Sequence, residues 1–399
     1  MPHIRLLTAA TVLILVAAAG AVMGQEGAGA PERSAGRALN IGVGTAGLSL
    51  GNSHRWNGLR FNVVDRDVER INGLNVTFWR PVHNEDAVYN GLSIGLVPGG
   101  GTFRGLTVGL GAAVADGEMA GINIGGLALV SGGALRGVNI AGLATVAERD
   151  MAGINLAGLG TVAEGDMLGI NVGGLGAVAQ GSVAGINVGG LGLVVRGDLS
   201  GLNVAGLGTV ASGSMTGINI GGLGTIAEGD MTGINVGGLG SVASGDMVGV
   251  SIAGLGLVAS GSMAGISVAG LGAVGSGEIS GIAVAGLGVV GSGGPLYGVA
   301  VTAGEVRDVA GIRGLAIGGY RVRTEDMRGW ATSVAWTRIG TLHGVSIAAY
   351  NRVERQQGLT IGVFNYTQEL HGIQIGVLNF AGNNRGAARW LPIVNAHLH

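Results

Sequence analysis

Two short segments match the motif G-x-S-x-G, in which a serine on a tight turn attacks a carbonyl carbon. They are residues 47–51 and 91–95. Such a serine needs a strand, a strained turn and a following helix, together with His and Asp partners. Both segments are copies of a repeated G-[LIV]-x-[IV]-G pattern with serine in its third place. We therefore interpret both serines as parts of the repeat.

Paired carboxylates are the second candidate chemistry, because hard cations prefer oxygen ligands. Glu164 with Asp166, and Glu228 with Asp230, lie in turn-forming sequence, but the repeats between them carry uncharged residues at these places. We interpret the acidic positions as a solvated turn edge.

An irregular segment, residues 79–89, brings His83, Glu85 and Asp86 close together in sequence. Loops on a repeat scaffold concentrate binding residues, yet a polar capping loop is the simpler interpretation. An enzyme acting along a polymer would need a clustered acid pair, and the carboxylates are scattered. The sequence therefore predicts no catalytic residue, no metal, no cofactor and no small-molecule substrate, so we expect a protein that is not an enzyme.

One repeat must position all of these residues. It reads G-[IVL]-N-[IVL]-[GA]-G-L-[GA]-x-V-A-x-G-[DS]-[ML]-x, and a constant period without insertions indicates an array of equivalent units. Twelve glycines recur every sixteen residues: Gly105, Gly121, Gly137, Gly153, Gly169, Gly185, Gly201, Gly217, Gly233, Gly249, Gly265 and Gly281.

Each repeat predicts two short strands and two tight corners. In residues 233–248, Ile234 and Val236 alternate with small or polar residues, two glycines follow, residues 239–243 form a second apolar run, and residues 244–246 form a turn. Helix is disfavoured, because each glycine costs about 1 kcal/mol relative to alanine. We predict an all-β repeat protein, a parallel two-sided β-solenoid (β-helix) of 14–16-residue coils with capped ends. We expect the Ile/Val, Leu, Val and Met positions to stack as its core.

Asparagine occupies the same place in eight consecutive repeats. Stacked amides can form a hydrogen-bonded ladder, and we interpret this one as structural, with its face, inward or outward, left open. Its members are Asn123, Asn139, Asn155, Asn171, Asn187, Asn203, Asn219 and Asn235.

The alternative fold is a transmembrane β-barrel with one long strand per repeat, and the alternative function is an outer-membrane pore or transporter. Mean hydropathy is +0.51, which suits either architecture. However, Leu239 and Val242 are three residues apart, whereas a barrel strand alternates strictly. Flanking repeats are also one or two residues shorter, which a corner absorbs and a strand does not.

The chain begins with features of an export signal. A short positive segment precedes an apolar run, residues 6–21, and small residues that suit cleavage. We predict a signal peptide at 1–24, a flexible linker at 25–38, irregular N-terminal capping repeats at 39–104, the regular array at 105–297, irregular C-terminal repeats at 298–382, and a C-terminal cap at 383–399. All aromatic residues lie outside 105–296, as expected if bulky side chains cover the ends.

Composition limits the partners. The chain has no cysteine, so it has neither disulfides nor thiolate metal sites. Residues 105–296 hold 3 Arg against 11 Asp and Glu, whereas nucleic-acid binding needs a basic stripe. We expect no nucleic-acid partner, and we leave membrane association open.

The downstream repeats carry a second pattern, G-[VLI]-x-[IV]-[GA]-V-x-N-[YF], as in residues 358–366 and 372–380, followed by Leu-Pro-Ile-Val-Asn at 391–395. With these motifs the chain resembles the bacterial surface repeat-containing family found in spirochaetes and other bacteria, most clearly over 340–399. The resemblance implies an exported protein at the bacterial surface, outer membrane or exterior, and it implies no catalytic residues. We expect a structural, scaffold or adhesion role with cell-envelope or surface components as partners.

Overall fold

The computed structural model describes residues 37–397. The predicted signal peptide, and residues 25–36 of the predicted linker, lie outside the described residues. The chain divides into two compact units, Met1–Val210 and Ala211–His399, which are considered separately below.

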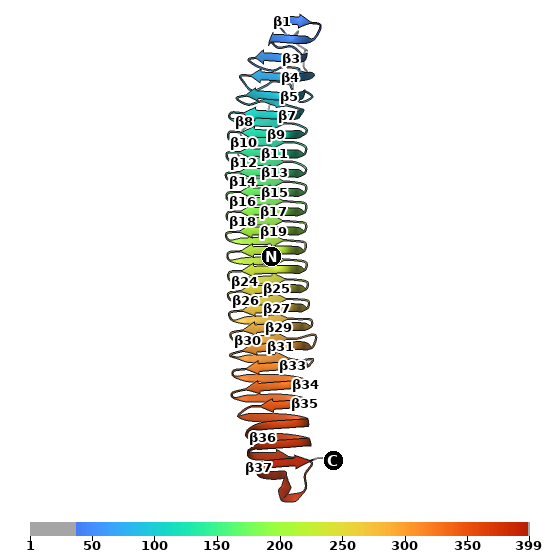
Figure 1. Cartoon of the computed structure of the whole chain (residues 1–399), viewed down its shortest axis with the longest axis vertical. Helices are drawn as coiled ribbons and strands as arrows, with labels where there is room; N and C mark the ends of the chain where they lie inside the picture. Colours follow the sequence, from blue (N-terminus) through green and yellow to red (C-terminus); the bar gives the residue numbers. More distant parts are fainter. Residues whose placement is uncertain (1–36, 398–399) are drawn as a thin grey trace. The chain divides into compact units, whose positions relative to one another are not determined.

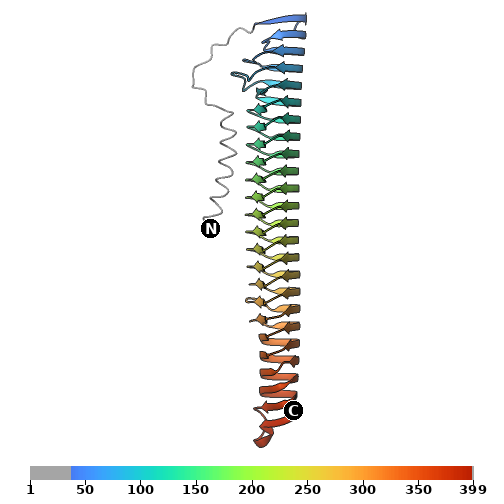
Figure 2. The ribbon, with the colours of Figure 1, turned by 90° about the vertical axis from the view of Figure 1, so that its left-hand side faces the viewer.

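Unit 1 is a stack of coils in which a long strand alternates with a short one (Figures 1 and 2). Its strands are β1 (Ala38–Val43), β2 (Ala46–Gly51), β3 (Arg55–Asn62), β4 (Arg70–Thr77), β5 (Val88–Gly95), β6 (Gly99–Gly100), β7 (Thr102–Gly109), β8 (Ala112–Ala115), β9 (Met119–Gly125), β10 (Ala128–Ser131), β11 (Leu135–Ala141), β12 (Ala144–Ala147), β13 (Met151–Ala157), β14 (Gly160–Ala163), β15 (Met167–Gly173), β16 (Gly176–Ala179), β17 (Val183–Gly189), β18 (Gly192–Val195), β19 (Leu199–Ala205) and, at the boundary, β20 (Gly208–Ala211).

Unit 2 repeats this construction, and its last strands are longer because the corners between them are extended. Its elements are β21 (Met215–Gly221), β22 (Gly224–Ala227), β23 (Met231–Gly237), β24 (Gly240–Ala243), β25 (Met247–Ala253), β26 (Gly256–Ala259), β27 (Met263–Ala269), β28 (Gly272–Gly275), β29 (Ile279–Ala285), β30 (Gly288–Gly291), β31 (Leu296–Thr302), β32 (Glu305–Asp308), β33 (Ile312–Gly318), β34 (Arg321–Ser333), β35 (Trp336–Ile347), β36 (Tyr350–Ala381), a 3-10 helix (Gly386–Arg389) and β37 (Trp390–His397).

Coils pair in parallel and without register shift. Within unit 1, Met167 of β15 lies opposite Val183 of β17, and Gly176 of β16 lies opposite Gly192 of β18. The predicted parallel two-sided solenoid is therefore confirmed, and the alternative of one long antiparallel strand per repeat is wrong for these strands. No helix among residues 37–397 is long and apolar enough to cross a membrane.

Each solenoid end is covered by an antiparallel strand. In unit 1, β1 pairs with β2, and in unit 2, β37 pairs with β36. Trp390 of β37 lies 5.9 Å from the ring of Phe364, which in turn stacks on Tyr350 at 5.2 Å. These pairings occupy sheet edges that would otherwise be open for association.

The interior is formed by the Asn, the Ala and the Met or Leu positions of each coil, which differs from the predicted core. Met167 and Asn171 are fully buried and Ala177 is 4% exposed, whereas Ile170 is 37% exposed and Leu175 is 51% exposed. The expected Met position is correct. The prediction that the Ile/Val, Leu and Val positions face inward is wrong, because these strands turn the residues between them, such as Asn171 and Ala177, to the interior.

The repeat glycines explain the close packing of the coils and the constant period. Gly169 has φ +109°, and a Cβ atom there would lie 2.2 Å from the carbonyl oxygen of Gly153 in the coil before. At the corner, a Cβ atom on Gly173 would lie 2.0 Å from the carbonyl oxygen of Gly176. Neighbouring coils, and the two strands of a coil at its corner, thus approach too closely at these glycines for a Cβ atom. The interior beside them holds Asn, Ala and Met, and in some coils Leu, as at Leu193 and Leu199.

Candidate functional site

In each unit the asparagine column lies inside the coils as an amide ladder. In unit 1, the Nδ2 atom of Asn155 donates to Oδ1 of Asn171 at 2.7 Å, and Asn171 donates to Asn187 at 2.8 Å. In unit 2, Asn219 donates to Asn235 at 2.9 Å. The predicted stacking is present, and the open question of its direction is answered, since Asn171 is fully buried. A buried amide is tolerated only when its polar atoms are paired, so the repeated residue satisfies itself along the stack.

The ladder is shielded from any ligand in the surroundings. Oδ1 of Asn123 in unit 1 and Nδ2 of Asn235 in unit 2 are buried without hydrogen-bond partners. Ser251 takes the same slot in the next coil of unit 2 and is 2% exposed. The ladder is therefore a structural element of the core.

The acidic turns form a second column, which bonds to the backbone. Oδ1 of Asp150 accepts from the backbone N–H of Asp166 at 3.0 Å, and Oδ1 of Asp166 accepts from that of Ser182 at 2.7 Å. Ser182 does the same for Asp198 through its hydroxyl oxygen at 3.2 Å. Because serine replaces aspartate without changing this role, the conserved function of the slot is to satisfy the next coil's N–H group.

The residues of the predicted capping loop differ in burial and in their contacts. His83, Glu85 and Asp86 are exposed, while Asn84 between them is 6% exposed and donates to the carbonyl oxygen of Gly99 at 2.8 Å. Among residues 37–397, no group of three or more His, Cys, Asp or Glu side chains could hold a metal ion. The buried amide of Asn84 therefore anchors the loop.

The serines of the two G-x-S-x-G segments are inward residues of the coil. Ser49 is fully buried and shares a hydrogen bond of 2.9 Å with Ser53, and Ser93 is 3% exposed. Both stand in register with the asparagine slot, as the sequence predicted from the repeat.

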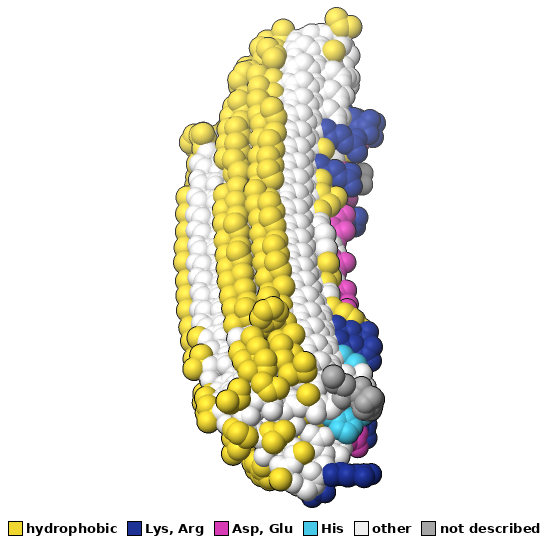
Figure 3. Space-filling model, turned by 60° about the horizontal axis from the view of Figure 1, so that its bottom comes forward, with side chains coloured by type: hydrophobic (Ala, Val, Ile, Leu, Met, Phe, Trp, Pro, Cys, Tyr) yellow, Lys and Arg dark blue, Asp and Glu magenta, His cyan; other side chains and the backbone are white. Residues whose placement is uncertain are grey.

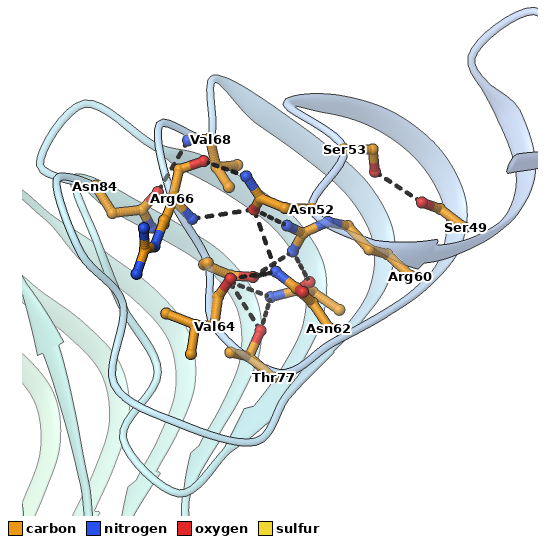
Figure 4. Close-up of polar contacts among 12 residues, drawn as sticks. Ser49, Asn52, Ser53, Arg60, Asn62, Val64, Arg66, Val68, Thr77 and Asn84 are labelled. Carbon is orange, nitrogen blue, oxygen red and sulfur yellow. Dashed lines mark hydrogen bonds and ion pairs between the residues drawn. The ribbon is translucent and has the colours of Figure 1, made fainter. Parts of the chain in front are cut away.

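A charged network lies inside the N-terminal coils, where the sequence gave no warning of it (Figure 4). Arg60 occupies the asparagine slot of β3, is fully buried, and places Nη1 2.6 Å from Oδ1 of Asp65. The same Nη1 donates to Oδ1 of Asn75 at 2.6 Å, and Nη2 donates to Oδ1 of Asn52 at 3.0 Å. Asp65 comes from the segment between β3 and β4, which turns inward to meet the guanidinium.

The Asp65 carboxylate is kept ionised by its neighbours. Burial acts to raise the pKa of Asp65, but the Arg60 charge and hydrogen bonds from Asn62, Tyr89 and Thr77 outweigh it, so the pKa lies below its usual value. The hydroxyl of Tyr89 donates to Oδ2 of Asp65 at 2.7 Å. Burial and the charge of Asp65 raise the pKa of Tyr89 well above its usual value, so the hydroxyl remains a donor. The network is a closed ionic core with no reacting group facing solvent.

Aliphatic side chains cover the outside of the long strands. Two outward columns flank the inward asparagine slot, and charged side chains gather at one edge of the face (Figure 3). In β9–β19 the first column is Ile122, Val138, Ile154, Ile170, Ile186 and Leu202, and the second is Ile124, Ile140, Leu156, Val172, Val188 and Val204. We call these two columns, continued through the outward residues of β2–β7, the aliphatic face of unit 1.

A third apolar column runs along the corner between the two strands of a coil. It includes Leu159, Leu175 and Leu191, which are 40%, 51% and 50% exposed. Scattered exposed aliphatic residues are ordinary, but contiguous apolar surface of this extent marks an interaction site. The outside of the coil, rather than a pocket, is therefore the candidate functional site.

Unit 2 adds a positively charged column near its C-terminal end. Arg323, Arg338 and Arg352 lie opposite one another on β34, β35 and β36 and line a shallow hollow with Glu325 and Glu354. Two of these arginines, Arg338 and Arg352, are exposed.

The aliphatic face was missed because the alternation Ile-Asn-Val is equally regular in both phases. The available signal was the asparagine itself, since an identical amide in every coil can satisfy itself in the core and leaves the aliphatic residues for the outside. Comparison with known proteins gave no match: no family model, no curated protein and no solved structure matches this chain.

Proposed function

We propose that this protein is an exported, non-enzymatic scaffold of the bacterial envelope or surface, which acts by presenting long apolar faces for assembly or adhesion. The observation that carries this proposal is the aliphatic face, whose two columns contain only Ile, Val and Leu through β9–β19. A rigid, repetitive surface without charge suits association with another extended surface.

The interior supports the same role. Amide, hydroxyl and carboxylate groups are used to join one coil to the next, as Asn155, Asn171 and Asp166 illustrate. These polar side chains thus stabilise the stack of coils. The exposed residues of the aliphatic face are suited to binding through shape and apolar contact. The predicted export signal and the resemblance to surface repeat proteins favour the cell envelope as the place of this association.

Fractionation of cells tests the proposal. The full chain, with an epitope tag after His399, is produced in a Gram-negative bacterium, alongside a matched chain lacking residues 2–24. We expect the full chain in the envelope or the medium and the matched chain in the cytoplasm. Recovery of both chains in the cytoplasm would overturn the proposed export and with it the envelope role.

A further inference from the structure

The outer side of the long strands of unit 1, which carries the aliphatic face, is large enough for a stable interface. Eleven long strands contribute to it, namely β2, β3, β4, β5, β7, β9, β11, β13, β15, β17 and β19. At about 4.8 Å between strands and about 3.3 Å per residue, the outer face of this many seven-residue strands measures roughly 53 by 23 Å, or about 1,200 Å², and the two aliphatic columns cover about half of it. Specific complexes bury about 800 Å² per partner, so the strand face as a whole, and not the two columns alone, meets the usual requirement.

The composition of the face favours protein over lipid as its occupant. Surfaces that lie in a membrane interface carry Trp or Phe beside Lys or Arg. The two columns in β9–β19 hold neither aromatic nor charged residues. The acidic turns of the same coils, such as Glu164 and Asp166, are exposed at the edge of the face and would oppose approach to an anionic lipid surface.

The spacing of the columns matches the spacing of a second copy. Each column places one β-branched or leucine side chain per coil, with full in-register pairing such as Ile154 opposite Ile170 and Ile170 opposite Ile186. Two such faces related by a two-fold axis have the same period, so their ridges and grooves can interlock along the whole length, as in stacked sheets.

We propose that a second copy of this chain docks on the aliphatic face of unit 1, sheet against sheet, so that the working form is a two-fold dimer. The inference rests on the proposed scaffold function and names its first partner. The acidic edge, which holds Glu148, Glu164 and Gln180, stays outside the interface and keeps the dimer soluble.

Sedimentation of the full chain tests this proposal. We expect a dimer at low micromolar concentration. The variant Ile154→Lys, Ile170→Lys, Ile186→Lys places three charges on the face and should weaken dimerisation at least 100-fold, because ammonium groups would be buried unpaired. The control carries three lysines in the same coils on the turn edge, Glu148→Lys, Glu164→Lys, Gln180→Lys, and should dimerise within 3-fold of the unaltered chain. A third variant, Leu159→Lys, Leu175→Lys, Leu191→Lys, tests the corner column as the alternative contact surface, and we expect it to weaken dimerisation less than the three isoleucine substitutions do.

Far-UV circular dichroism verifies that each variant is folded. Should the lysine variant lose its β signal, the set Ile154→Thr, Ile170→Thr, Ile186→Thr keeps β-branched residues and should still weaken the dimer about 10-fold or more. A monomeric unaltered chain at 100 µM, or loss of the dimer only in the corner variant, would overturn the proposal.

Flotation with neutral phosphatidylcholine vesicles separates the lipid alternative. We expect the chain to stay at the bottom of the gradient, whereas a monomer that floats would show that the face binds lipid. A monomer that is nevertheless exported would contradict the dimer alone, and a dimer retained in the cytoplasm would contradict the proposed function alone.

Discussion

The regular coils β9–β19 and the N-terminal coils β2–β7 share one backbone design but fill the same interior slot in different ways. In β9–β19 the slot holds a neutral amide that bonds to its copies, as Asn155 does to Asn171. In β3 it holds Arg60, which bonds to Asp65 at 2.6 Å. In the array of constant period, this interior slot is uncharged, and its amides form hydrogen bonds with their copies in the neighbouring coils. In the irregularly spaced coil of β3, the slot is charged, and its partner Asp65 comes from a connecting segment.

The difference does not come from the spacing of the coils alone. An amide ladder needs asparagine in register on neighbouring coils, and such a ladder also forms across irregular spacing, since Asn72 donates to Asn57 at 2.6 Å and Asn90 donates to Asn72 at 2.8 Å. Arg60 instead takes its partner Asp65 from the segment between β3 and β4, and Asn62 at the end of β3 also donates to Asp65. The charged slot of β3 therefore depends on how that segment turns inward.

The most direct test of this comparison is to place asparagine, the residue of the regular array, in the slot that Arg60 occupies. Arg60→Asn should lower the free energy of unfolding by about 3–5 kcal/mol, because it leaves the Asp65 carboxylate buried without its cation. Urea unfolding followed by circular dichroism measures the change. The double variant Arg60→Asn, Asp65→Asn should recover most of the loss, and a double variant as unstable as the single one would contradict the ionic account.

In the regular array, replacing the repeat glycine should destabilise the fold by a similar amount. Gly169→Ala forces a side chain into φ +109° and against the Gly153 carbonyl, so we expect a loss of about 3 kcal/mol. Gly192→Ala is the matched control, since its Cβ would meet no atom closer than 3.7 Å. Equal midpoints for the two variants in urea would refute the steric origin of the period.

Removing one ladder amide should cost less. Asn171→Ala leaves Nδ2 of Asn155 and Oδ1 of Asn187 unpaired in the core, so we expect about 2 kcal/mol of destabilisation. The control Ile170→Ala, one residue away on the outside, should cost about 1 kcal/mol or less in the monomer. A larger effect at Ile170 than at Asn171 in dilute, monomeric protein would reverse the assignment of inside and outside.

Acid should destabilise the N-terminal coils more than the regular coils. The folded pKa of Asp65 lies below its unfolded value of 3.8, so its stabilisation is present above that pH and is lost as pH falls below it through the folded pKa. The ladder amides do not titrate. Hydrogen exchange should therefore show protection falling in β3–β5 below pH 4 while β13–β17 keeps its protection, and Asp65→Asn should remove this difference. A uniform loss across both regions would speak against it.

The sequence was sufficient for the architecture. Constant spacing, paired glycines and shortened flanking repeats predicted coils, corners and parallel stacking, because each of these is a property of the backbone. The sequence did not show which side of each strand faces the interior, because Ile170, Asn171 and Val172 alternate regularly whichever side is buried. The close packing of the coils at Gly169 and Gly173 decides between the two arrangements. The sequence was also insufficient for Arg60 and Asp65, whose pairing depends on how an irregular segment turns inward.

The central claim is that the Asn, the Ala and the Met or Leu positions of each coil fill the solenoid, while the Ile/Val positions beside the asparagine and the corner leucine cover it. Because the chain has no cysteine, a single introduced thiol reports this directly. Leu175→Cys lies at the corner, where the leucine is 51% exposed, and Ala177→Cys lies two residues on, where the alanine is 4% exposed. We predict that a maleimide labels the first thiol at least 100-fold faster than the second in the folded chain, with equal rates in urea. Faster labelling at residue 177 would contradict the account.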